Sequence, residues 1–322
     1  MSRSEMPEAV RILRESESFL IAGHTNPDGD CLGSMCALIL ALSSLGKSAF
    51  AVTLEGVPDL YRFLPGSERI LTEVPAGRRF DAAIVLDSDR SSRIGPVSES
   101  LTSCDRLLVL DHHLGETWTE GVRILDPSVA SCGELVFELL IAANVKVTSE
   151  IADCLFTSIM TDTGSFRHSN VKPQTLRNAA ELVASGASPD KIARNVYESR
   201  SLAATRLLGI ALSNIQTVDA GRIAYTTITM RDIVETGAVE ADTEGIVSYV
   251  RSIRNSRIAI FFREVEEGAR VSLRSTAGDD VSAIAREFGG GGHRAAAGCT
   301  VERPFDEVIG VVLEAVRRWT AS

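Results

Sequence analysis

Short apolar runs alternate with stretches of helical periodicity over the first half of the chain. Nearly continuous apolar runs lie at residues 19–23, 48–54, 81–87 and 106–113. Such runs are typical of parallel strands that helices bury on both faces. Apolar residues at helical spacing between about 30 and 45, and again between 131 and 166, predict the helices. The first half is therefore predicted to be a parallel sheet sandwiched by helices.

A second pattern follows a segment rich in Gly, Ser and Pro. Apolar and polar residues alternate at 222–230, 257–265 and 270–276, which is typical of a twisted, partly exposed sheet. Helical patterns at about 242–254, 280–288 and 304–319 would cover that sheet. The prediction is an α/β domain (1–184), a connector (185–205) and a smaller α+β domain (206–322), with a cleft between the domains.

Composition and charge narrow the functional classes. The formal net charge is −10, whereas proteins that bind long nucleic acids need a basic surface to neutralise phosphates. Long duplex DNA is therefore not an expected partner, although a small phosphorylated ligand is compatible with this charge. The sequence shows no signal-like apolar core and no apolar run near the ~20 residues that span a bilayer. We therefore expect a cytoplasmic protein without a membrane partner.

The six cysteines are scattered and include no C-x-x-C pair. This spacing fits neither a zinc ribbon nor a disulfide framework, so we interpret them as small apolar residues of the core. Cys31 lies within the segment HTNPDGDCLGS (24–34) and could ligate a metal. Packing of its helix is the interpretation that we favour.

Acidic residues and histidines gather where the predicted strands end. They follow the first predicted strand, lie at the ends of the third and fourth strands, and occur in the segment TDTGSF. These residues are His24, Asp28, Asp30, Asp87, Asp111, His112, His113 and Asp162. In an open parallel sheet these ends share one edge, where ligands bind. Carboxylates crowded there would repel one another unless cations compensated them. His and Asp ligands without thiolate suit Mn²⁺, Mg²⁺ or Fe²⁺, and about six ligands suit two ions that share a carboxylate.

Six motifs, in order, resemble the DHH phosphoesterase family. HTNPDGDCLGS, VLDSDR, LDHH and TDTGSF are similar to its four catalytic motifs, and SLRS and FGGGGHRAAAG to the DHH-associated C-terminal domain. The resemblance covers nearly the whole chain and is greatest to the bacterial nanoRNases. It implies an oligoribonuclease that also acts as a 3′-phosphoadenosine-5′-phosphate (PAP) phosphatase, with two divalent cations, manganese first and magnesium, iron or cobalt as alternatives.

The resemblance also implies roles for individual residues. One cation would be held by His24, Asp28 and Asp87. The second would be held by Asp30, Asp87, His112 and Asp162, so that Asp87 bridges the two. Asn26 and Asp111 would support these ligands, and His113 would face the substrate phosphate. Asp89 and His168 match no ligand position, and we interpret them as a turn or capping residue and a surface residue.

The C-terminal motifs suggest a substrate-binding surface. A helix end needs one glycine in the left-handed region, yet four follow the predicted helix at 280–288. Glycines let backbone N–H groups approach an anion closely, so we expect the substrate to contact this run, with the neighbouring polar residues, at Arg274, Ser275, Gly290, Gly291, Gly292 and His293. Arg251, Arg254 and Arg257 are expected on one solvated helix face.

The leading hypothesis is a divalent-metal-dependent phosphohydrolase of short RNA oligonucleotides, releasing nucleoside 5′-monophosphates, or of PAP. Hydrolysis of linear di-AMP in cyclic-dinucleotide turnover, of pyrophosphate or of polyphosphate is the alternative on the same scaffold. A catalytically inactive nucleotide sensor is a further alternative, although no ligand of the implied set is missing. A dehydrogenase is excluded because no G-x-G-x-x-G follows the first strand. A homodimer remains open.

Overall fold

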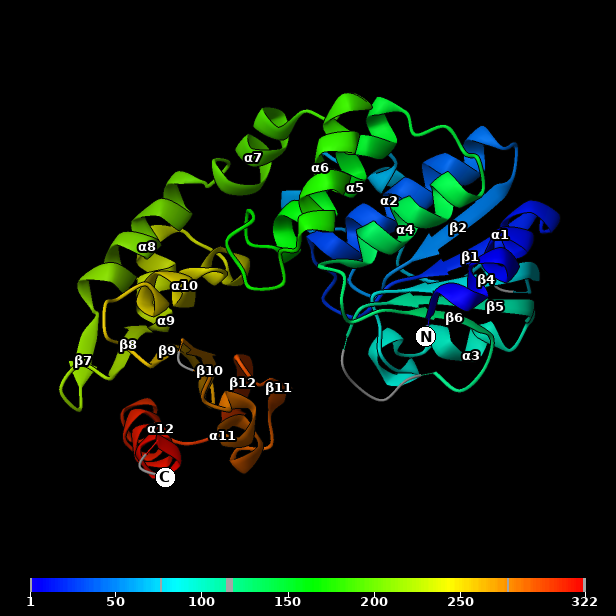
Figure 1. The fold of residues 1–322 in the computed structure, drawn as a ribbon. Coiled ribbons are helices and arrows are strands. Elements are labelled where there is room, and N and C mark those ends of the chain that lie inside the picture. The colour runs from blue at the N-terminus through cyan, green and yellow to red at the C-terminus, as the bar shows by residue number, and fades with distance from the viewer. Residues whose placement is uncertain (1, 76, 114–117, 277, 321–322) are drawn as a thin grey trace. The chain divides into compact units, whose positions relative to one another are not determined.

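The computed structural model describes residues 2–75, 77–113, 118–276 and 278–320. The chain divides into two compact units, 1–199 and 200–322, which are described separately (Figure 1). The division falls inside the segment 185–205, which is itself largely helical. Helix α7 (Pro189–Tyr197) belongs to the first unit, where Ile192 joins the core.

The first unit is built on a six-stranded sheet in which every pairing is parallel, as the apolar runs predict. The strand order is β3-β2-β1-β4-β5-β6. The strands are β1 (Ser18–Ala22), β2 (Ser48–Val52), β3 (Ile70–Leu71), β4 (Phe80–Leu86), β5 (Cys104–Asp111) and β6 (Val122–Leu125). The chain reverses its direction of progress across the sheet between β1 and β4, and ligand sites of open parallel sheets lie at such a point.

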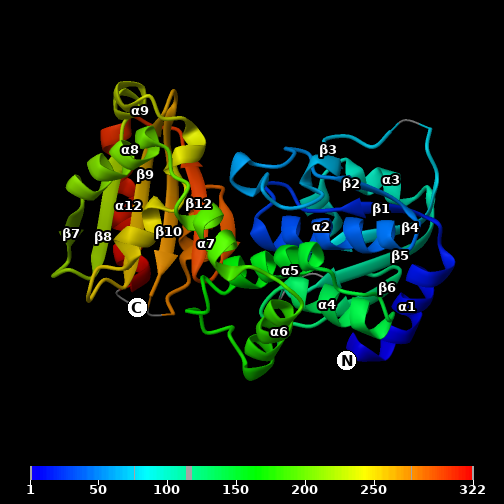
Figure 2. The same cartoon turned by 90° about the horizontal axis from the view of Figure 1, so that it is seen from above.

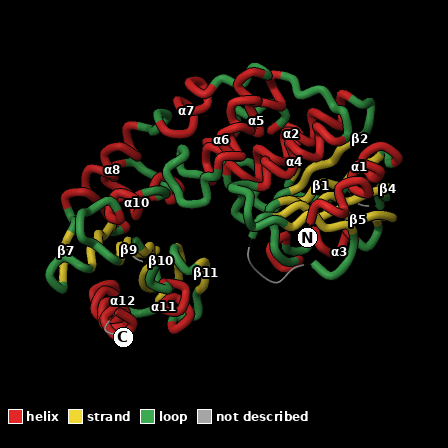
Figure 3. Tube along the Cα trace, viewed as in Figure 1, coloured by secondary structure: helices red, strands yellow, loops and turns green. Residues whose placement is uncertain are grey.

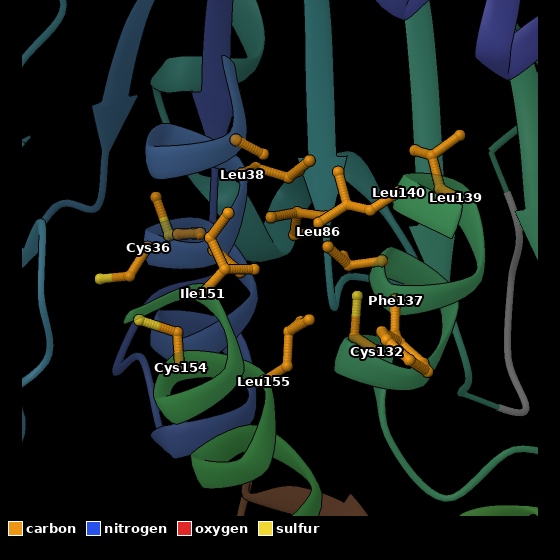
Figure 4. Close-up of a cluster of buried hydrophobic side chains, with 14 of the residues drawn as sticks. Cys36, Leu38, Leu86, Cys132, Phe137, Leu139, Leu140, Ile151, Cys154 and Leu155 are labelled. Carbon is orange, nitrogen blue, oxygen red and sulfur yellow. The ribbon is translucent and has the colours of Figure 1, made fainter. Parts of the chain in front are cut away.

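Helices cover both faces of this sheet (Figures 1 and 3). One face is packed by α1 (Met6–Glu15), α2 (Gly29–Ser44), α4 (Cys132–Ala142) and α5 (Ser149–Asp162). The other is covered by α3 (Val97–Leu101) and the preceding 3₁₀ turn. Figure 4 shows side chains of α2, α4 and α5 meeting Leu86 of β4 in the larger core. The fold class predicted for this domain is confirmed.

Two small residues let the helices above the sheet approach closely. A Cβ at Gly33 of α2 would lie 2.5 Å from the carbonyl oxygen of Cys154, and one at Gly133 of α4 would lie 2.0 Å from Oγ of Ser158. Both contacts are closer than real Cβ atoms allow. Because these residues lack side chains, the starts of α2 and α4 can pack closely against α5.

Two buried acidic residues connect the last two helices of the first unit, α6 and α7, to α4 and α5. Glu134, at the start of α4, accepts hydrogen bonds from Thr175 Oγ1 at 3.0 Å and Asn178 Nδ2 at 2.5 Å, both on α6 (Pro173–Ala184). Asp153 of α5 accepts from the backbone N–H of Ser188 and pairs with Lys191 at 3.0 Å, at the start of α7. These carboxylates have a structural role.

The second unit has a six-stranded mixed sheet of order β11-β12-β10-β9-β8-β7. Its strands are β7 (Gln216–Val218), β8 (Ile223–Ile228), β9 (Ile258–Val265), β10 (Gly268–Ser275), β11 (Gly291–His293) and β12 (Ala296–Val301). Helices α11 (Val281–Glu287) and α12 (Phe305–Thr320) cover one face, and α8 (Leu202–Ser213), α9 (Met230–Thr236) and α10 (Ile246–Arg251) pack on the other (Figure 2). The predicted α+β class is confirmed, with both sheet faces covered instead of one partly exposed.

The expected helix over 242–254 is shorter than predicted. Helix α10 ends at Arg251, and Asn255 in the following turn has a left-handed φ of 69°. The prediction that Arg251, Arg254 and Arg257 share one helix face is therefore wrong. Arg257 precedes β9 and pairs with Asp279 at 2.6 Å.

The described residues include no helix with the length and apolarity needed to cross a bilayer.

Candidate active site

Three strand ends and two helix ends of the first unit bring the predicted ligands together. His24 follows β1, Asp87 follows β4, and β5 ends at Asp111, directly before His112. The start of α2 contributes its N-cap residue, Asp28, and Asp30 of the first turn, and α5 ends at Asp162. The sheet topology thus places these side chains at one edge, as the sequence predicts.

Asp87 lies at the centre of the cluster. The residue is 2% exposed, with Oδ2 3.3 Å from His24 Nε2 and Oδ1 3.4 Å from both His112 Nε2 and His113 Nδ1. Its φ of 55° is in the left-handed region, which is uncommon outside glycine and clusters at functional sites. Its backbone N–H still donates to Leu110 of β5 at 3.0 Å, so the strand end holds the strained residue in place.

Asp30 is anchored by the start of α4 as well as by its own helix. Oδ2 accepts from the N–H of Cys132 at 2.8 Å, and Oδ1 accepts from the N–H of Gly133 at 3.1 Å and from Ser158 Oγ at 2.5 Å. A helix N-terminus favours negative charge, because its first N–H groups lack helical partners. The N–H groups at the start of α4 therefore offset part of the cost of a negative charge on Asp30, whose Oδ2 lies 3.4 Å from His112 Nε2.

Asp28 caps α2 with one carboxylate oxygen, Oδ1, so its other oxygen is not part of the cap. Its Oδ1 accepts from the backbone N–H groups of Asp30 and Cys31 at 3.0 and 3.1 Å, which fixes the turn. The side chain is 57% exposed, and Oδ1 lies 3.9 Å from His24 Nε2. His24 Nδ1 donates to the carbonyl oxygen of Thr25 at 2.7 Å, so Nε2 is the nitrogen turned to the carboxylates.

His113 and Asp111 form a pair beside Asp87. His113 Nδ1 lies 2.7 Å from Asp111 Oδ1, which also accepts from the backbone N–H groups of His112 and His113. Arg93 Nη1 lies 3.5 Å from His113 Nε2 and 3.9 Å from Asp89 Oδ1. No sequence pattern pointed to this guanidinium, because only the folded loop after β4 brings it beside His113.

Opposite charges raise the pKa values of the histidines. Burial lowers the pKa of His24, but the carboxylates of Asp28 and Asp87 outweigh it and raise the pKa to about 10. Burial likewise opposes protonation of His112, whereas Asp87 and Asp30 raise its pKa to about 10. Without a bound cation, both imidazoles are therefore positively charged at neutral pH.

The pKa values of the carboxylates shift in different directions. Burial and repulsion from Asp87 raise the pKa of Asp30 well above its ordinary value. Burial, which attraction to His112 only partly offsets, and repulsion from Asp87 raise the pKa of Asp162 to about 6. Burial also disfavours charge on Asp87, but contacts with His112 and His24 lower its pKa well below the ordinary value. The cluster therefore has too few positive charges for its carboxylates.

The donor set fits divalent cations. Three groups of donor atoms each lie within 4.8 Å of one another: His24, Cys31 and Asp87; Asp87, His112 and His113; and Asp30, His112 and Asp162. Asp87 Oδ1 is buried and has no hydrogen-bond partner among the described residues. A buried carboxylate oxygen without a hydrogen bond is costly, and a cation would satisfy it. Asp87 belongs to two of these groups, and His112 links the group that contains Asp87 to the group of Asp30 and Asp162.

The remaining predicted residues of the first unit lie around this cluster. Asn26 is exposed with a φ of 53°, and its N–H donates to Glu55 Oε2 at 3.0 Å, so it shapes the turn. Asp89 is 9% exposed and faces Arg90 and Arg93 at 3.6 and 3.9 Å; the structure shows no helix cap there. His168 is exposed, as expected, with Nδ1 3.3 Å from the carbonyl oxygen of Asp162.

The predicted substrate residues lie together in the second unit. Arg274 of β10 and His293 of β11 both stand opposite Ala296 in the strand register, although the side chain of His293 lies outside the described part of the chain. Burial and repulsion from Arg251 lower the pKa of Arg274, whose Nη1 donates to the carbonyl oxygen of Leu273 at 3.0 Å. Ser275 Oγ is buried without a hydrogen-bond partner in the described structure.

The glycine run has structural reasons as well. Gly289, with a φ of 72°, follows α11 in the left-handed conformation of a helix cap. A Cβ at Gly290 would lie 2.2 Å from the carbonyl oxygen of Gly298, and one at Gly292 would lie 2.6 Å from that of Ala296. At Gly291 the structure leaves open space, so close packing against β12 accounts for much of the run but not for all of it.

Two family models match the chain and together cover most of it. The model described as DHH family, N-terminal domain, matches residues 18–159, and the DHHA1 domain matches residues 221–322. Both matches agree with the order of the motifs in the sequence.

Curated relatives match over nearly the full length. The bifunctional oligoribonuclease and PAP phosphatase NrnA of Thermus thermophilus is 34% identical over 302 residues, 92% of this chain and 88% of that protein. The protein of the same name from Bacillus subtilis is 27% identical, over 91% of this chain and 92% of its own length.

Solved structures share the fold. An exopolyphosphatase-related protein from Bacteroides fragilis superposes with a TM-score of 0.94 at 28% identity, over 98% of this chain and 96% of that one. RecJ from Thermus thermophilus in complex with Mn²⁺ has a TM-score of 0.57 at 13% identity, over 98% of this chain and 55% of RecJ, which shows the fold alone.

Proposed function

Because this chain belongs to the DHH family, we propose that it is a divalent-metal-dependent phosphohydrolase of short nucleotides. It would cleave short oligoribonucleotides to nucleoside 5′-monophosphates and remove the 3′-phosphate of PAP. The name of the Thermus relative supports these substrates. The observation that carries the proposal is the Asp87 carboxylate, buried among three imidazoles, with one oxygen that has no hydrogen-bond partner among the described residues.

The proposed ligands divide into two sets that share Asp87. His24, Asp28 and Asp87 would hold one cation, and the second would be held by Asp30, Asp87, His112 and Asp162. Cations bound there would lower the pKa of a water molecule and neutralise charge on the phosphoryl oxygens. Oxygen and nitrogen donors favour manganese first, with magnesium, iron or cobalt as alternatives.

The neighbouring residues would position the phosphate. Asp111 accepts from His113 Nδ1 and so fixes the ring, which leaves Nε2, beside Arg93, as the atom that meets the substrate. A proton on Nε2 would pass to the leaving 3′-oxygen, and the Arg93 guanidinium would bind a phosphoryl oxygen. Asn26 would hold the turn that carries Asp28.

The far end of the substrate would bind to the second unit. Arg274, partly buried with no carboxylate partner among the described residues, is the proposed contact for a terminal phosphate. Ser275, with its unpaired hydroxyl, the N–H groups of Gly290, Gly291 and Gly292, and His293 would complete this surface.

A substrate panel tests the proposal and its rivals together. We expect hydrolysis of dinucleotides, and of PAP, with Mn²⁺ to exceed hydrolysis of linear di-AMP, pyrophosphate and polyphosphate by at least about tenfold in kcat/KM, or ~1.4 kcal/mol of transition-state stabilisation. Oligoribonucleotides of graded length should be cleaved more slowly as they lengthen. Faster hydrolysis of polyphosphate would favour the activity after which the Bacteroides protein is named. No hydrolysis of any substrate would favour a sensor.

The cellular setting that we propose is the cytoplasm. All six cysteines are unpaired, and five of them are buried, as is usual where thiols stay reduced.

A further inference from the structure

The loop that follows Asp162, the last residue of α5, has a strained backbone. Gly164, Ser165 and Phe166 have φ values of 54°, 60° and 61°, so three successive residues lie in the left-handed region. Residues with side chains seldom adopt this conformation, and a bulky residue such as phenylalanine does so least. Strain of this kind clusters at functional sites. Here it bends the chain so that Asn170 returns to Asp162.

The amide of Asn170 joins the ends of two helices. Its Nδ2 lies 3.1 Å from the carbonyl oxygen of Ala130, and 3.2 and 3.3 Å from the carbonyl oxygen and Oδ2 of Asp162. Because all three acceptors are oxygens, the amide nitrogen is the atom that faces them, and it donates to them. Ala130 directly precedes Ser131, the N-cap of α4, whereas Asp162 ends α5. One side chain therefore connects the start of α4 to the end of α5.

These two helix ends position two acids of the same proposed cation site. The carboxylate of Asp30 accepts from two N–H groups in the first turn of α4, so the position of α4 determines the position of Asp30. Donor atoms of Asp30, His112 and Asp162 lie within 4.8 Å of one another. The contacts of Asn170 thus fix the spacing between two carboxylates that repel each other when both are ionised.

The hydrogen bond to the Asp162 carboxylate has a further effect. The C-terminal end of a helix is negative, because its last carbonyl groups lack helical partners, and Asp162 lies at that end of α5. The Asn170 N–H offsets part of the resulting repulsion and fixes the carboxylate with Oδ2 3.9 Å from His112 Nε2. Asn170 Oδ1 is buried without a hydrogen-bond partner among the described residues. Packing alone would not favour an amide with an unsatisfied oxygen at this position.

We propose that Asn170 is a positioning residue that sets the geometry of Asp30 and Asp162 around the cation that they share with Asp87 and His112. The inference rests on the proposed function, which places a cation on these four residues. Polar groups of this kind orient metal ligands, and their removal typically lowers metal affinity by about 10–100-fold.

The other proposed cation should depend much less on Asn170. Its ligands would be His24, Asp28 and Asp87, whereas the acceptors of Asn170 belong to the start of α4 and the end of α5. Loss of the amide is therefore expected to separate the two affinities, which a general loosening of the fold would not do.

The experiment is a titration of the full chain, treated with EDTA and dialysed, with Mn²⁺, in which the six-line EPR signal counts the unbound ions. The unsubstituted chain is expected to bind two ions. In Asn170→Ala the affinity for one of them should fall by about 10–100-fold, with the affinity for the other within about twofold. Asn170→Leu, which fills the space without a donor, should behave in the same way. Hydrolysis of a dinucleotide by both variants should fall at limiting Mn²⁺ and recover as Mn²⁺ is raised.

His168→Ala is the matched control. His168 belongs to the same loop and is exposed, and its Nδ1 lies 3.3 Å from the carbonyl oxygen of Asp162, not from the carboxylate. This variant should keep both Mn²⁺ affinities within about twofold, since no contact with a proposed ligand side chain is removed.

The outcomes separate this inference from the proposed function. Unchanged Mn²⁺ affinities in Asn170→Ala, or an equal loss of both, would overturn the role of Asn170. An equal effect of His168→Ala would also overturn it, because disruption of the loop would then suffice. An unsubstituted chain that binds two Mn²⁺ ions but hydrolyses no substrate of the panel would contradict the proposed function and leave the role of Asn170 supported by its affinities. A chain that binds no Mn²⁺ would contradict both.

Discussion

Asp87→Asn is expected to lower manganese-dependent hydrolysis of a dinucleotide by about 10³-fold or more. Metal ions contribute several kcal/mol of charge stabilisation to phosphoryl transfer, and each ~1.4 kcal/mol is tenfold in rate. Asparagine keeps the shape of the side chain but replaces an anionic oxygen with an amide group that repels cations. It also tolerates the left-handed backbone at this position, where φ is 55°, so the fold should survive. The measurement is kcat/KM with saturating Mn²⁺.

Asp81→Asn is the matched control for that change. Asp81 lies on the same strand, at the opposite end from Asp87, where Oδ2 accepts from the backbone N–H groups of Glu17 and Ser18 at 2.8 and 2.9 Å. Its loss of charge should cost about 1 kcal/mol of stability and leave kcat/KM within about twofold. An Asp87→Asn protein that keeps a tenth of the activity would contradict the bridging role.

Manganese should stabilise the first unit by about 4 kcal/mol for each ion at 1,000 times its Kd, because binding to the folded state alone adds RT ln(1 + [L]/Kd). Asp30, Asp87 and Asp162 lie close together only in the folded chain, so the cations bind the folded state and not the unfolded one. Trp118 is a convenient reporter, since its Nε1 donates to the carbonyl oxygen of Ser88, the residue after Asp87, at 2.9 Å. The chain has only two tryptophans, so Trp319→Phe leaves Trp118 alone to follow urea unfolding with Mn²⁺ or with EDTA.

The same gain should grow as the pH rises. Because the pKa values of His24 and His112 are raised to about 10, their protonation stabilises the cation-free fold fully below the ordinary value near 6.5. That contribution is lost as the pH rises toward 10. A cation must displace these protons, so its apparent affinity should rise by up to about tenfold per pH unit for each proton released. Stabilisation by Mn²⁺ should therefore be larger at pH 8 than at pH 6.

Asp153→Asn provides the control for this measurement. Asp153 is a buried acid of α5, the helix that ends in Asp162, but it pairs with Lys191 away from the centre. The variant should be less stable with EDTA and should still gain the full increment from Mn²⁺. Equal stability of the unsubstituted unit with Mn²⁺ and with EDTA would show that the acids are compensated in some other way.

The parallel sheet and the grouping of the candidate residues at its edge could be predicted because both follow local rules. Continuous apolar runs identify strands buried on two faces, and parallel connectivity brings the ends of β1, β4 and β5 to one edge. His24, Asp87 and His112 each follow such an end, so their meeting did not depend on details of packing. The positions of Asp28 and Asp30 follow from the cap of α2.

Other features depend on contacts that no local pattern records. The proximity of Cys31 to His24 and Asp87 arises because Gly23 lacks a side chain. Arg93 reaches His113 only through the loop after β4. Helix α10 ends at Arg251, earlier than its periodicity suggests, because the chain must turn at Asn255 to enter β9. The sequence suggested that the glycine run contacts an anionic substrate, yet two of its glycines are needed for close packing against β12.

The most direct test of the account is the anomalous diffraction of crystals grown with Mn²⁺. We expect two manganese peaks about 3.5–4 Å apart, the spacing of two-metal phosphoryl-transfer sites, with the carboxylate of Asp87 between them. Peaks located elsewhere, or a cluster of Asp30, Asp87, His112 and Asp162 with no anomalous density, would contradict it.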